Sequence, residues 1–507
     1  MPRVLVGRAR TVSLQGLLAQ PVLVEAVLAS GLPNFTIVGL ADAAVNEARE
    51  RLRSGFHAIG QRWPNQRLTV NLSPADITKS GTAFDLGIAV AVFGALGFSA
   101  VDSDALVLGE LGLDGSIRGV QGVLPALLAA QQNHITRAIV PAANYAEAQL
   151  VSGLEVTPVD HLAQVARLLG APTADVPPLV LPENPVASGA AESIDMADVC
   201  GQEEAIWGLT VAAAGGHHAL LVGPPGVGKS MLAQRLPGIL PDLSAQAAVE
   251  VAAIRSVCGE AVTALPRRAP FSAPHHSATV AALVGGGSGI PRPGAITRAH
   301  RGILFCDEFP EFSTSVLQAL RQPLETGWIE LHRAKATVRY PARFQLIAAA
   351  NPCRCGRLYD APGSCTCTSR DRINYRAALG GPVRDRIDIS LRLNRPSPAQ
   401  LKSGGSVSSS QLREKITAAR DRQLSRSANT GAVSNSELTG RWLRQNTKLS
   451  SRLNQQLEQR MVSGQLSMRA IDRILRLSWT VADLAGRAAP TDSDVMAAMM
   501  LRGQGEQ

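Results

Sequence analysis

The sequence predicts an α/β protein in three parts: an N-terminal α/β domain, a parallel-sheet core around a glycine-rich loop, and a C-terminal helical region. Three observations predict this organisation. Short β-rich runs alternate with helical runs before residue 176, an apolar strand meets a glycine-rich loop at Gly223, and leucine and isoleucine recur at helical spacing after residue 411. A chain of 507 residues is longer than a single hydrophobic core ordinarily accommodates, so several domains are expected.

Composition narrows the class of protein. Apolar residues make up 45% of the chain, which is enough for most of it to fold, and the formal charge of +9 favours an anionic partner such as nucleic acid. The N-terminus lacks a continuous apolar signal segment. The most apolar run, residues 86–100, is shorter than a membrane helix and is expected to be a buried helix. We therefore expect a cytoplasmic protein without membrane contact, whose thiols stay reduced.

Changes in composition along the chain divide it into five segments. Proline and small residues mark one linker, serine and glycine mark another, and strands alternate with helices between them as in a parallel α/β sheet. The expected segments are an N-terminal domain at 1–176, a linker at 177–194, the core at 195–395, a linker at 396–410 and a helical domain at 411–507.

The strongest motif in the chain is "ALLVGPPGVGKSML", in which a strand, a glycine-rich loop and a helix follow one another. Its G-x-x-x-x-G-K-S pattern surrounds nucleotide phosphates with backbone amides and a helix N-terminus. Lys229 supplies a charge to the β- and γ-phosphates, and the Ser230 hydroxyl is a Mg²⁺ ligand. We expect ATP and Mg²⁺ as cofactors, with the nucleotide held by Gly223, Pro224, Pro225, Gly226, Val227, Gly228, Lys229 and Ser230.

Two further apolar strands end in polar residues suited to this chemistry. "GILFCDEF" places Asp307 and Glu308 at a strand's carboxyl end, where ligands of open α/β sheets bind. Asp307 is expected to hold Mg²⁺, directly or through water, and Glu308 to polarise the attacking water as a general base. Cys306 is expected to be a small core residue. "ARFQLIAAANP" ends at Asn351, whose amide is suited to orient water against the γ-phosphate; the alternative is a turn-forming asparagine before proline.

Two arginines precede a predicted strand in "GPVRDRIDISLRL". An arginine that reaches the phosphate of a neighbouring subunit stabilises charge in the transition state. Of Arg384 and Arg386, the second is the candidate for this role, and the alternative is a solvated surface residue.

Four of the seven cysteines lie in "NPCRCGRLYDAPGSCTCTSRDR", as Cys353/Cys355 and Cys365/Cys367. Four thiolates complete a tetrahedral Zn²⁺ site and leave no open position, so a metal here would be structural. A bound metal would hold together a polar loop that is too short to form a hydrophobic core of its own. The alternative is a group of unmetallated thiols.

These motifs, in this order, resemble those of the AAA+ ATPases and, more narrowly, the ComM/YifB family of magnesium-chelatase-like ATPases. The resemblance covers nearly the whole chain and rests on long stretches: "GLPNFTIVGLADAAVNEARERLRSGF", "LTVNLSPADITKSGTAFDLGIAVAV", "SAPHHSATVAALVGGGSGIPRPGAITRAHRGILFCDE", "ANPCRCG" and "SMRAIDRILRLSWTVADLAG".

The resemblance implies a role for each motif. The N-terminal domain would have the Lon-protease-like (ribosomal S5 domain 2-like) fold, the middle would be the AAA+ core, and the C-terminal helices its lid. By the same resemblance, the segment Asp198–Ala212 packs near the adenine. The site assignments that it implies are Gly223–Ser230 as Walker A, Asp307 and Glu308 as Walker B, Asn351 as sensor 1, Arg386 as arginine finger and Arg469 as sensor 2.

The resemblance also implies an ATP-hydrolysing, hexameric ring motor on DNA: a branch-migration helicase in recombination or natural transformation. One alternative is an AAA+ adaptor or unfoldase acting on proteins, which would present an aromatic pore residue; the predicted hairpin tip "HRAKA" has none, although Trp328 and Tyr340 flank it. A second alternative is a chelatase-type ATPase subunit, and such subunits usually lack a Lon-like domain.

Two loops are candidates for contact with DNA. The predicted hairpin carries His332, Arg333 and Lys335, and a Gly/Pro-rich insert carries Arg292 and Arg298. Basic residues on loops suit sequence-independent phosphate contacts, and the alternative is ordinary solvated turns.

The N-terminal domain is expected to be a non-proteolytic relative of Lon peptidases, which use a Ser–Lys dyad. The alignment of "KSGTAFDLG" and "GVQGVLPALLAA" places Thr82 at the serine position and Leu124 at the lysine position. Leucine cannot accept the nucleophile's proton. Lys79 and Ser80 lie nearby, but neighbours in sequence rarely face each other.

Overall fold

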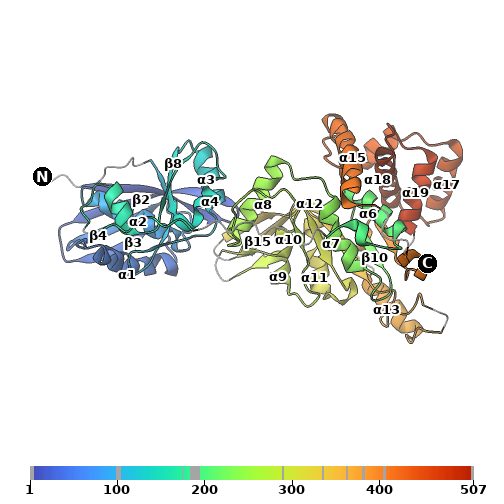
Figure 1. Cartoon of the computed structure of the whole chain (residues 1–507), viewed down its shortest axis with the longest axis horizontal. Helices are drawn as coiled ribbons and strands as arrows, with labels where there is room; N and C mark the ends of the chain where they lie inside the picture. Colours follow the sequence, from blue (N-terminus) through green and yellow to red (C-terminus); the bar gives the residue numbers. More distant parts are fainter. Residues whose placement is uncertain are drawn as a thin grey trace.

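The computed structural model describes residues 5–98, 104–173, 175–182, 194–287, 290–333, 336–360, 363–379, 383–402 and 407–503. An N-terminal α/β part, a central part built on a parallel sheet and a C-terminal helical part follow one another along the molecule's long axis (Figure 1). The predicted fold class, mixed α/β with a parallel-sheet core and a helical C-terminal region, is confirmed. Most of the predicted linker at 177–194 and part of that at 396–410 lie outside the described residues.

The N-terminal part is a mixed seven-stranded sheet in the order β3-β4-β2-β1-β5-β8-β9. The helix α2, Asp85–Ala95, packs on the long β1–β2 hairpin and is buried over almost its whole length, as its apolar sequence predicts. The strands are β1 Val6–Gln15, β2 Leu18–Ala29, β3 Asn34–Val38, β4 Arg67–Ser73, β5 Leu106–Val107, β8 Arg137–Pro141 and β9 Glu155–Val159, with a small pair β6 Glu110–Leu111 and β7 Ile117–Arg118. The other helices are α1 Ala43–Ala58, α3 Val123–Gln132, α4 Tyr145–Ala148 and α5 Leu162–Leu168.

The central part is built on a five-stranded sheet, in the order β11-β14-β17-β10-β18, whose strand pairs are all parallel. All residues of β10, β14 and β17 are buried and, apart from Gln345, they are apolar, because helices cover both faces of the sheet. Since parallel strands end at one edge, the loops that follow β14, β17 and β10 lie side by side. The strands are β10 Ala219–Val222, β11 Phe271–Ser272, β14 Ile303–Cys306, β17 Gln345–Ala350 and β18 Ile389–Arg392.

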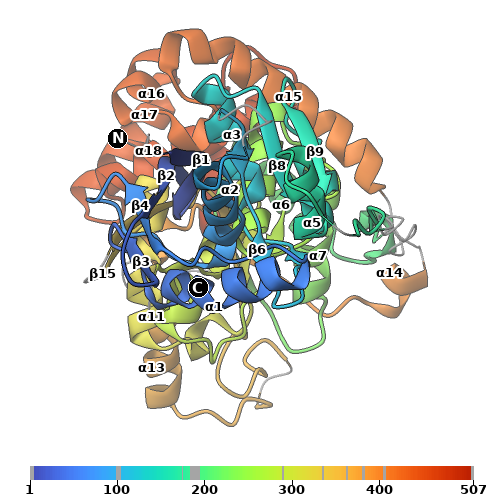
Figure 2. The same ribbon diagram turned by 90° about the vertical axis from the view of Figure 1, so that its left-hand side faces the viewer.

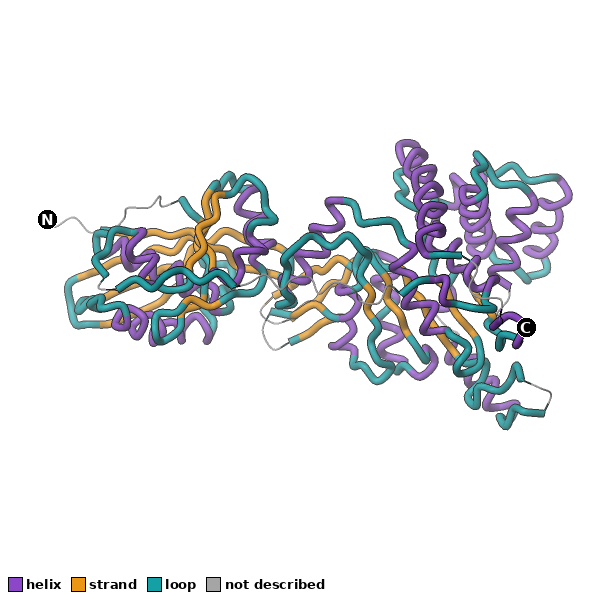
Figure 3. Tube along the Cα trace, viewed as in Figure 1, coloured by secondary structure: helices purple, strands orange, loops and turns teal. Residues whose placement is uncertain are grey.

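The helices of the central part are α6 Glu203–Gly215, α7 Lys229–Ile239, α8 Ala245–Val257, α9 Val280–Val284, α10 Ala295–Arg298, α11 Thr314–Ala319, α12 Arg321–Thr326 and α13 Ser369–Leu379. Two antiparallel pairs project from it: β12 Gly285–Gly286 with β13 Arg292–Pro293, and β15 Trp328–Arg333 with β16 Ala336–Pro341. Figure 3 shows that the strands in the described part of the chain all belong to the first two parts of the molecule.

The C-terminal part shares an apolar core with the central part. Ile416 and Ile474 belong to the same buried cluster as Leu221 of β10 and Leu232 of α7. In both views, most of these helices lie at the top of the molecule and α13 lies at the bottom (Figures 1 and 2). The helices are α14 Pro398–Lys402, α15 Ser409–Thr430, α16 Gly440–Asn446, α17 Ser451–Val462, α18 Met468–Leu484 and α19 Asp492–Gly503.

The N-terminal part contacts the central part through α3 and α8. Val123 and Leu127 of α3 share a buried cluster with Ala252 and Ala253 of α8, and the Gly122 N–H donates to the Ser256 carbonyl (3.1 Å). In the described part of the chain, no helix has both the length and the apolar character needed to cross a membrane.

Candidate functional site

The glycine-rich loop follows the buried strand β10 and leads into α7. Gly226 and Gly228 adopt positive φ angles of 78° and 94°, which lets the chain turn tightly before Lys229 begins the helix. The Lys229 ammonium is buried and donates to the carbonyls of Gly223 (2.7 Å) and Pro224 (3.0 Å). Burial lowers its pKa, and the nearby carboxylates of Asp307 and Glu308 act in the opposite direction.

Three neighbouring strand ends bring the predicted residues together. The Asn351 side chain, after β17, accepts a hydrogen bond from Lys229 (2.9 Å), and the Ser230 hydroxyl donates to Asp307, after β14 (2.6 Å). A hydroxyl and a carboxylate in direct contact are oxygen ligands of the kind that Mg²⁺ prefers, so these residues fit the predicted metal site. Cys306 is fully buried, and burial raises its pKa to about 12, as expected of a core residue.

Glu308 is held by a partner that the sequence did not reveal. Its backbone lies in the left-handed region, with φ of 49°, which is uncommon for a residue other than glycine. Its carboxylate contacts Nδ1 of His276 (2.9 Å), which follows β11, the strand next to β14. A histidine after a short strand was the only sequence signal.

Gln202 supports the assignment of the segment Asp198–Ala212 to the neighbourhood of the nucleotide. Its side chain donates to the carbonyl of Val227, in the glycine-rich loop (3.3 Å), and to that of Asn394 (2.8 Å). Gln202 thereby ties the segment before α6 to this loop.

Arg386 lies at the other edge of the sheet. It precedes β18, whose first residue, Ile389, pairs with Ala219, the first residue of β10; the glycine-rich loop follows the last residue of β10. The length of a four-residue strand, about 13 Å, therefore separates the two edges. Arg386 is thus placed away from the nucleotide loop of its own chain.

Arg469 and Arg386 are brought together at that edge. The pKa of Arg386 is lowered first by burial and then by the nearby guanidinium groups of Arg321, Arg473 and Arg469. Arg386 also forms an ion pair with Glu325. Two residues further, burial opposes ionisation of Asp388, but a hydrogen bond from His217 lowers its pKa to about 2. Asp388 also contacts Arg473 (3.6 Å). The arginines near Arg386 form a cationic cluster that carboxylates partly compensate.

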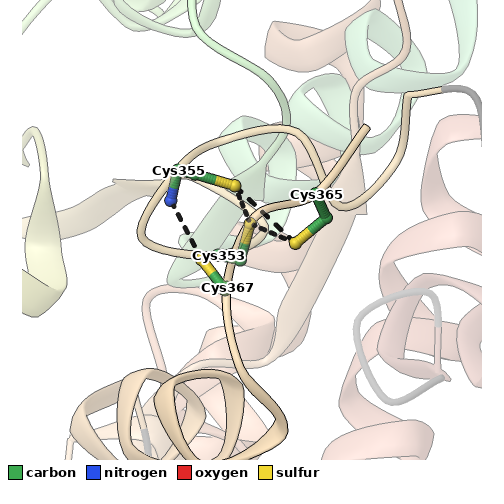
Figure 4. A group of neighbouring side chains, drawn as sticks. All are labelled: Cys353, Cys355, Cys365 and Cys367. Carbon is green, nitrogen blue, oxygen red and sulfur yellow. Dashed lines mark hydrogen bonds between the residues drawn. The ribbon is translucent and has the colours of Figure 1, made fainter. Parts of the chain in front are cut away.

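The four cysteines of the predicted metal site converge (Figure 4). All four sulfur atoms lie within 4.8 Å of one another, and the separations among Cys353, Cys355 and Cys365 are 3.4, 3.6 and 3.7 Å. Four thiolates at about 2.3 Å from a tetrahedral Zn²⁺ would lie about 3.8 Å apart, so the donor set fits this metal. The N–H of Arg357 lowers the pKa of Cys355, whereas burial raises the pKa of Cys353.

In the N-terminal part, the residues aligned with a peptidase dyad have other partners. The Thr82 hydroxyl donates to Glu110, and Leu124 is buried with its N–H bound to Glu147 (2.8 Å). The buried Lys79 ammonium donates to the Pro74 carbonyl, and the Ser80 hydroxyl to Asp42 (2.6 Å). Thr82 and Ser80 line a cavity of about 650 Å³ that also reaches Arg292 and Tyr340 of the central part.

The two loops proposed to contact DNA lie side by side. Gly286 of β12 lies beside the Arg333 guanidinium, and His332 and Arg333 at the end of β15 are exposed. Arg292 is exposed as well, whereas Arg298 is paired with Glu260 (3.6 Å). Lys335 at the predicted tip lies outside the described residues.

Comparison with known proteins identifies relatives along the chain. The family model described as "Magnesium chelatase, subunit ChlI" matches residues 195–401, "Subunit ChlI of Mg-chelatase" matches 24–144, and "Magnesium chelatase, subunit ChlI C-terminal" matches 406–502. An uncharacterized protein of Mycobacterium tuberculosis is 44% identical over 98% of this chain and 99% of its own length. The uncharacterized protein YifB of Escherichia coli is 41% identical (92% and 91%), and the competence protein ComM of Haemophilus influenzae is 40% identical (93% and 92%).

The parallel sheet, the glycine-rich loop and these matches define a magnesium-chelatase-like ATPase of the AAA+ class. Identities of 40–44% over more than nine-tenths of the chain are high enough to assign the whole chain to one family. The chain belongs to the ComM/YifB family, as its motifs predicted.

Proposed function

We propose that this protein is an ATP-driven motor that acts on DNA as a branch-migration helicase in recombination or natural transformation. The observation that carries the ATPase part is the convergence of Lys229, Ser230, Asp307 and Asn351 at three adjacent strand ends. The DNA part rests on the similarity to a protein named for competence and on the exposed basic residues of the two paired loops.

Each residue of the site has a role in this proposal. Lys229 neutralises the β- and γ-phosphates, and Ser230 with Asp307 would hold the Mg²⁺ that these phosphates bring. Once the Glu308 carboxylate has separated from His276, it accepts the proton of the attacking water, and Asn351 orients that water. Bound Mg²⁺ would supply neutralisation of the charge that develops on the phosphates.

The position of Arg386 supports a ring of subunits, which we propose to be hexameric. Arg386, the proposed finger, and Arg469, the proposed sensor 2, lie at the sheet edge opposite the nucleotide loop. A neighbouring subunit that placed this edge against the nucleotide would complete the site, because the arginines stabilise charge in the transition state.

We also propose that the N-terminal domain, residues 1–176, is a Lon-like module without peptidase activity, that linkers occupy 177–194 and 396–410, and that the core and lid span 195–395 and 411–507. The partners of Thr82 and Leu124 support the first part of this proposal. The cysteine cluster is proposed to hold a structural Zn²⁺.

The test of the function is the rate of ATP hydrolysis without DNA, with single-stranded DNA and with a four-way junction at equal nucleotide concentration. We expect DNA to stimulate hydrolysis, and a labelled junction to be converted into its products only with ATP. Absence of stimulation, together with no binding to DNA at low salt, would overturn the motor on DNA. Stimulation by an unfolded protein instead would favour the unfoldase alternative.

A further inference from the structure

The cysteine loop touches the nucleotide loop directly. Gly356, which lies between the two cysteine pairs, is buried, and an added Cβ there would come within 2.6 Å of Cδ of Pro225. Pro225 is part of the glycine-rich loop that surrounds the phosphates. Because the gap cannot accept even a methyl group, the two loops are in van der Waals contact without an intervening layer.

A second connection runs through the backbone to Asn351. The first cysteine, Cys353, is fully buried two residues after Asn351, whose side chain accepts from Lys229 (2.9 Å). A displacement of Cys353 would therefore be transmitted through Pro352 to the residue that holds the lysine in the phosphate site.

The rest of the loop is anchored to the end of β18. The Arg392 guanidinium lies 3.9 Å from the centre of the Tyr359 ring, and Asp360 pairs with Arg395 (3.4 Å). These contacts hold the middle of the loop against the sheet. The two cysteine pairs lie on either side of these contacts in the sequence, and their convergence brings the two ends of the loop together.

Four sulfur atoms at 3.4–4.8 Å make few attractive contacts of their own, and each is too far from the next for the covalent bond of about 2.05 Å found in disulfides. A metal at their centre supplies the missing attraction. We propose that Zn²⁺ in this cluster is a clamp on the nucleotide loop: bound metal holds Gly356 against Pro225 and Asn351 beside Lys229, so that occupancy of the cluster sets the affinity for nucleotide.

This inference rests on the proposed nucleotide site and adds to it a metal-dependent control. The first test uses the reduced full-length chain and measures bound zinc and the affinity for a fluorescent Mg-ADP analogue, without DNA. We expect about one zinc per chain, and replacement by Co²⁺ to give the absorption of a tetrahedral thiolate site. Cys365→Ser/Cys367→Ser should lose the metal and bind nucleotide about tenfold more weakly. Cys258→Ser, outside both the cluster and the segment Asp198–Ala212, is the control.

The second test separates a lost clamp from a misfolded variant. The wild-type chain is stripped with a chelator and then given back Zn²⁺ in the presence of Mg²⁺; we expect affinity to fall and to return. Gly356→Ala should keep zinc but weaken nucleotide binding, because its methyl group meets Pro225. Gly363→Ala in the same loop also has a positive φ, of 87°, but no atom in the described part of the chain lies within 4 Å of its added methyl group, so it should bind nucleotide as the wild type does.

A wild-type chain without zinc, or a zinc-free chain with unchanged nucleotide affinity, would overturn the clamp and leave the ATPase proposal standing. A zinc-loaded wild-type chain that binds no nucleotide would overturn both. Nucleotide binding that depends on zinc, with hydrolysis that ignores DNA, would support the clamp and overturn only the motor on DNA.

Discussion

The contact between Glu308 and His276 is the least expected pairing at the residue scale. The carboxylate proposed as general base is bound to an imidazole nitrogen at 2.9 Å, and its backbone is held in the left-handed region. A base bound in this way is not free to polarise water. His276 begins the segment that leads through α9 into the β12–β13 loop, so a partner on that loop has a short route to the base.

Replacement of His276 by alanine is expected to raise hydrolysis in the absence of DNA. Loss of one hydrogen bond worth on the order of 1 kcal/mol would release Glu308 about fivefold more often. Stimulation by DNA should fall by the same factor. The measurement is the steady-state ATPase rate with and without DNA, with His275→Ala as the neighbouring control. A rate below that of the wild type would instead make His276 a participant in hydrolysis.

Two substitutions separate binding from hydrolysis. Lys229→Ala should lose nucleotide affinity, because the ammonium is the only cation that the described structure places inside the loop. Glu308→Gln should bind nucleotide normally and hydrolyse it at least about a hundredfold more slowly, since a neutral amide cannot accept a proton. Equilibrium binding and single-turnover hydrolysis distinguish them. Normal hydrolysis by Glu308→Gln would contradict the base assignment.

The sequence indicates the position of a residue best where that residue directly follows an apolar strand. Asp307 and Asn351 were predicted because each directly follows an apolar strand, and the structure brings both to the glycine-rich loop. His276 was missed because β11 contains only two residues and gives no periodicity. The Gly356–Pro225 contact joins residues far apart in the chain, and nothing in either segment alone encodes it.

At the scale of elements, the expected contact with DNA rests on the β15–β16 hairpin. Its apolar side, with Ile329 and Val338, is buried, whereas His332 and Arg333 are exposed. The alternation typical of a half-buried hairpin therefore presents the basic end to solvent.

Arg333→Ala is expected to weaken DNA binding at every sequence and to flatten its salt dependence. Loss of one phosphate contact lowers the slope of log K against log salt by about 0.9 for duplex DNA. The measurement is a binding isotherm at several salt concentrations. Arg267→Ala removes an equal, exposed charge that pairs with Asp242 and is not part of the hairpin, and it should leave the slope unchanged. Equal slopes for wild type and Arg333→Ala would contradict the contact.

A buried histidine between α10 and β14 makes stability depend on pH. Nδ1 of His300 accepts from the Arg343 N–H (3.1 Å) and Nε2 contacts Glu250 (3.0 Å), an arrangement that fits the neutral ring. Burial lowers the pKa of His300 to about 4. As the pH falls from about 6.5 towards 4, this histidine binds a proton in the unfolded chain but stays neutral in the folded chain.

The free energy of unfolding should therefore be highest above pH 6.5 and fall by up to about 3 kcal/mol towards pH 4 through this residue. Denaturant unfolding at several pH values measures it. His300→Asn should flatten the dependence, because its amide oxygen can accept from Arg343 without titrating. The exposed His57→Asn is the control, and an unchanged slope in His300→Asn would contradict the assignment.

At the scale of the whole molecule, sequence patterns gave the three parts but not how they join. Periodicity predicts that α18 is amphipathic, yet Ile474 packs into the same core as Leu221 of the sheet, a contact across some 250 residues of chain. The joint between α3 and α8 is equally non-local: its small residues, such as Ala252 and Ala253, carry no signal that they face another domain. Sequence analysis identifies a buried face more readily than its partner.

The opposite placement of Lys229 and Arg386 has a genetic consequence. In the proposed ring, each site joins the lysine of one chain to the arginine of its neighbour, so Lys229→Ala removes the chain's own site and Arg386→Ala removes the site of the neighbour. A ring built from either variant alone would have no intact site. Two different defects would behave otherwise. In a random equal mixture of Lys229→Ala and Arg386→Ala chains, about a quarter of the junctions would pair an intact lysine with an intact arginine, so two inactive alleles would partly restore each other.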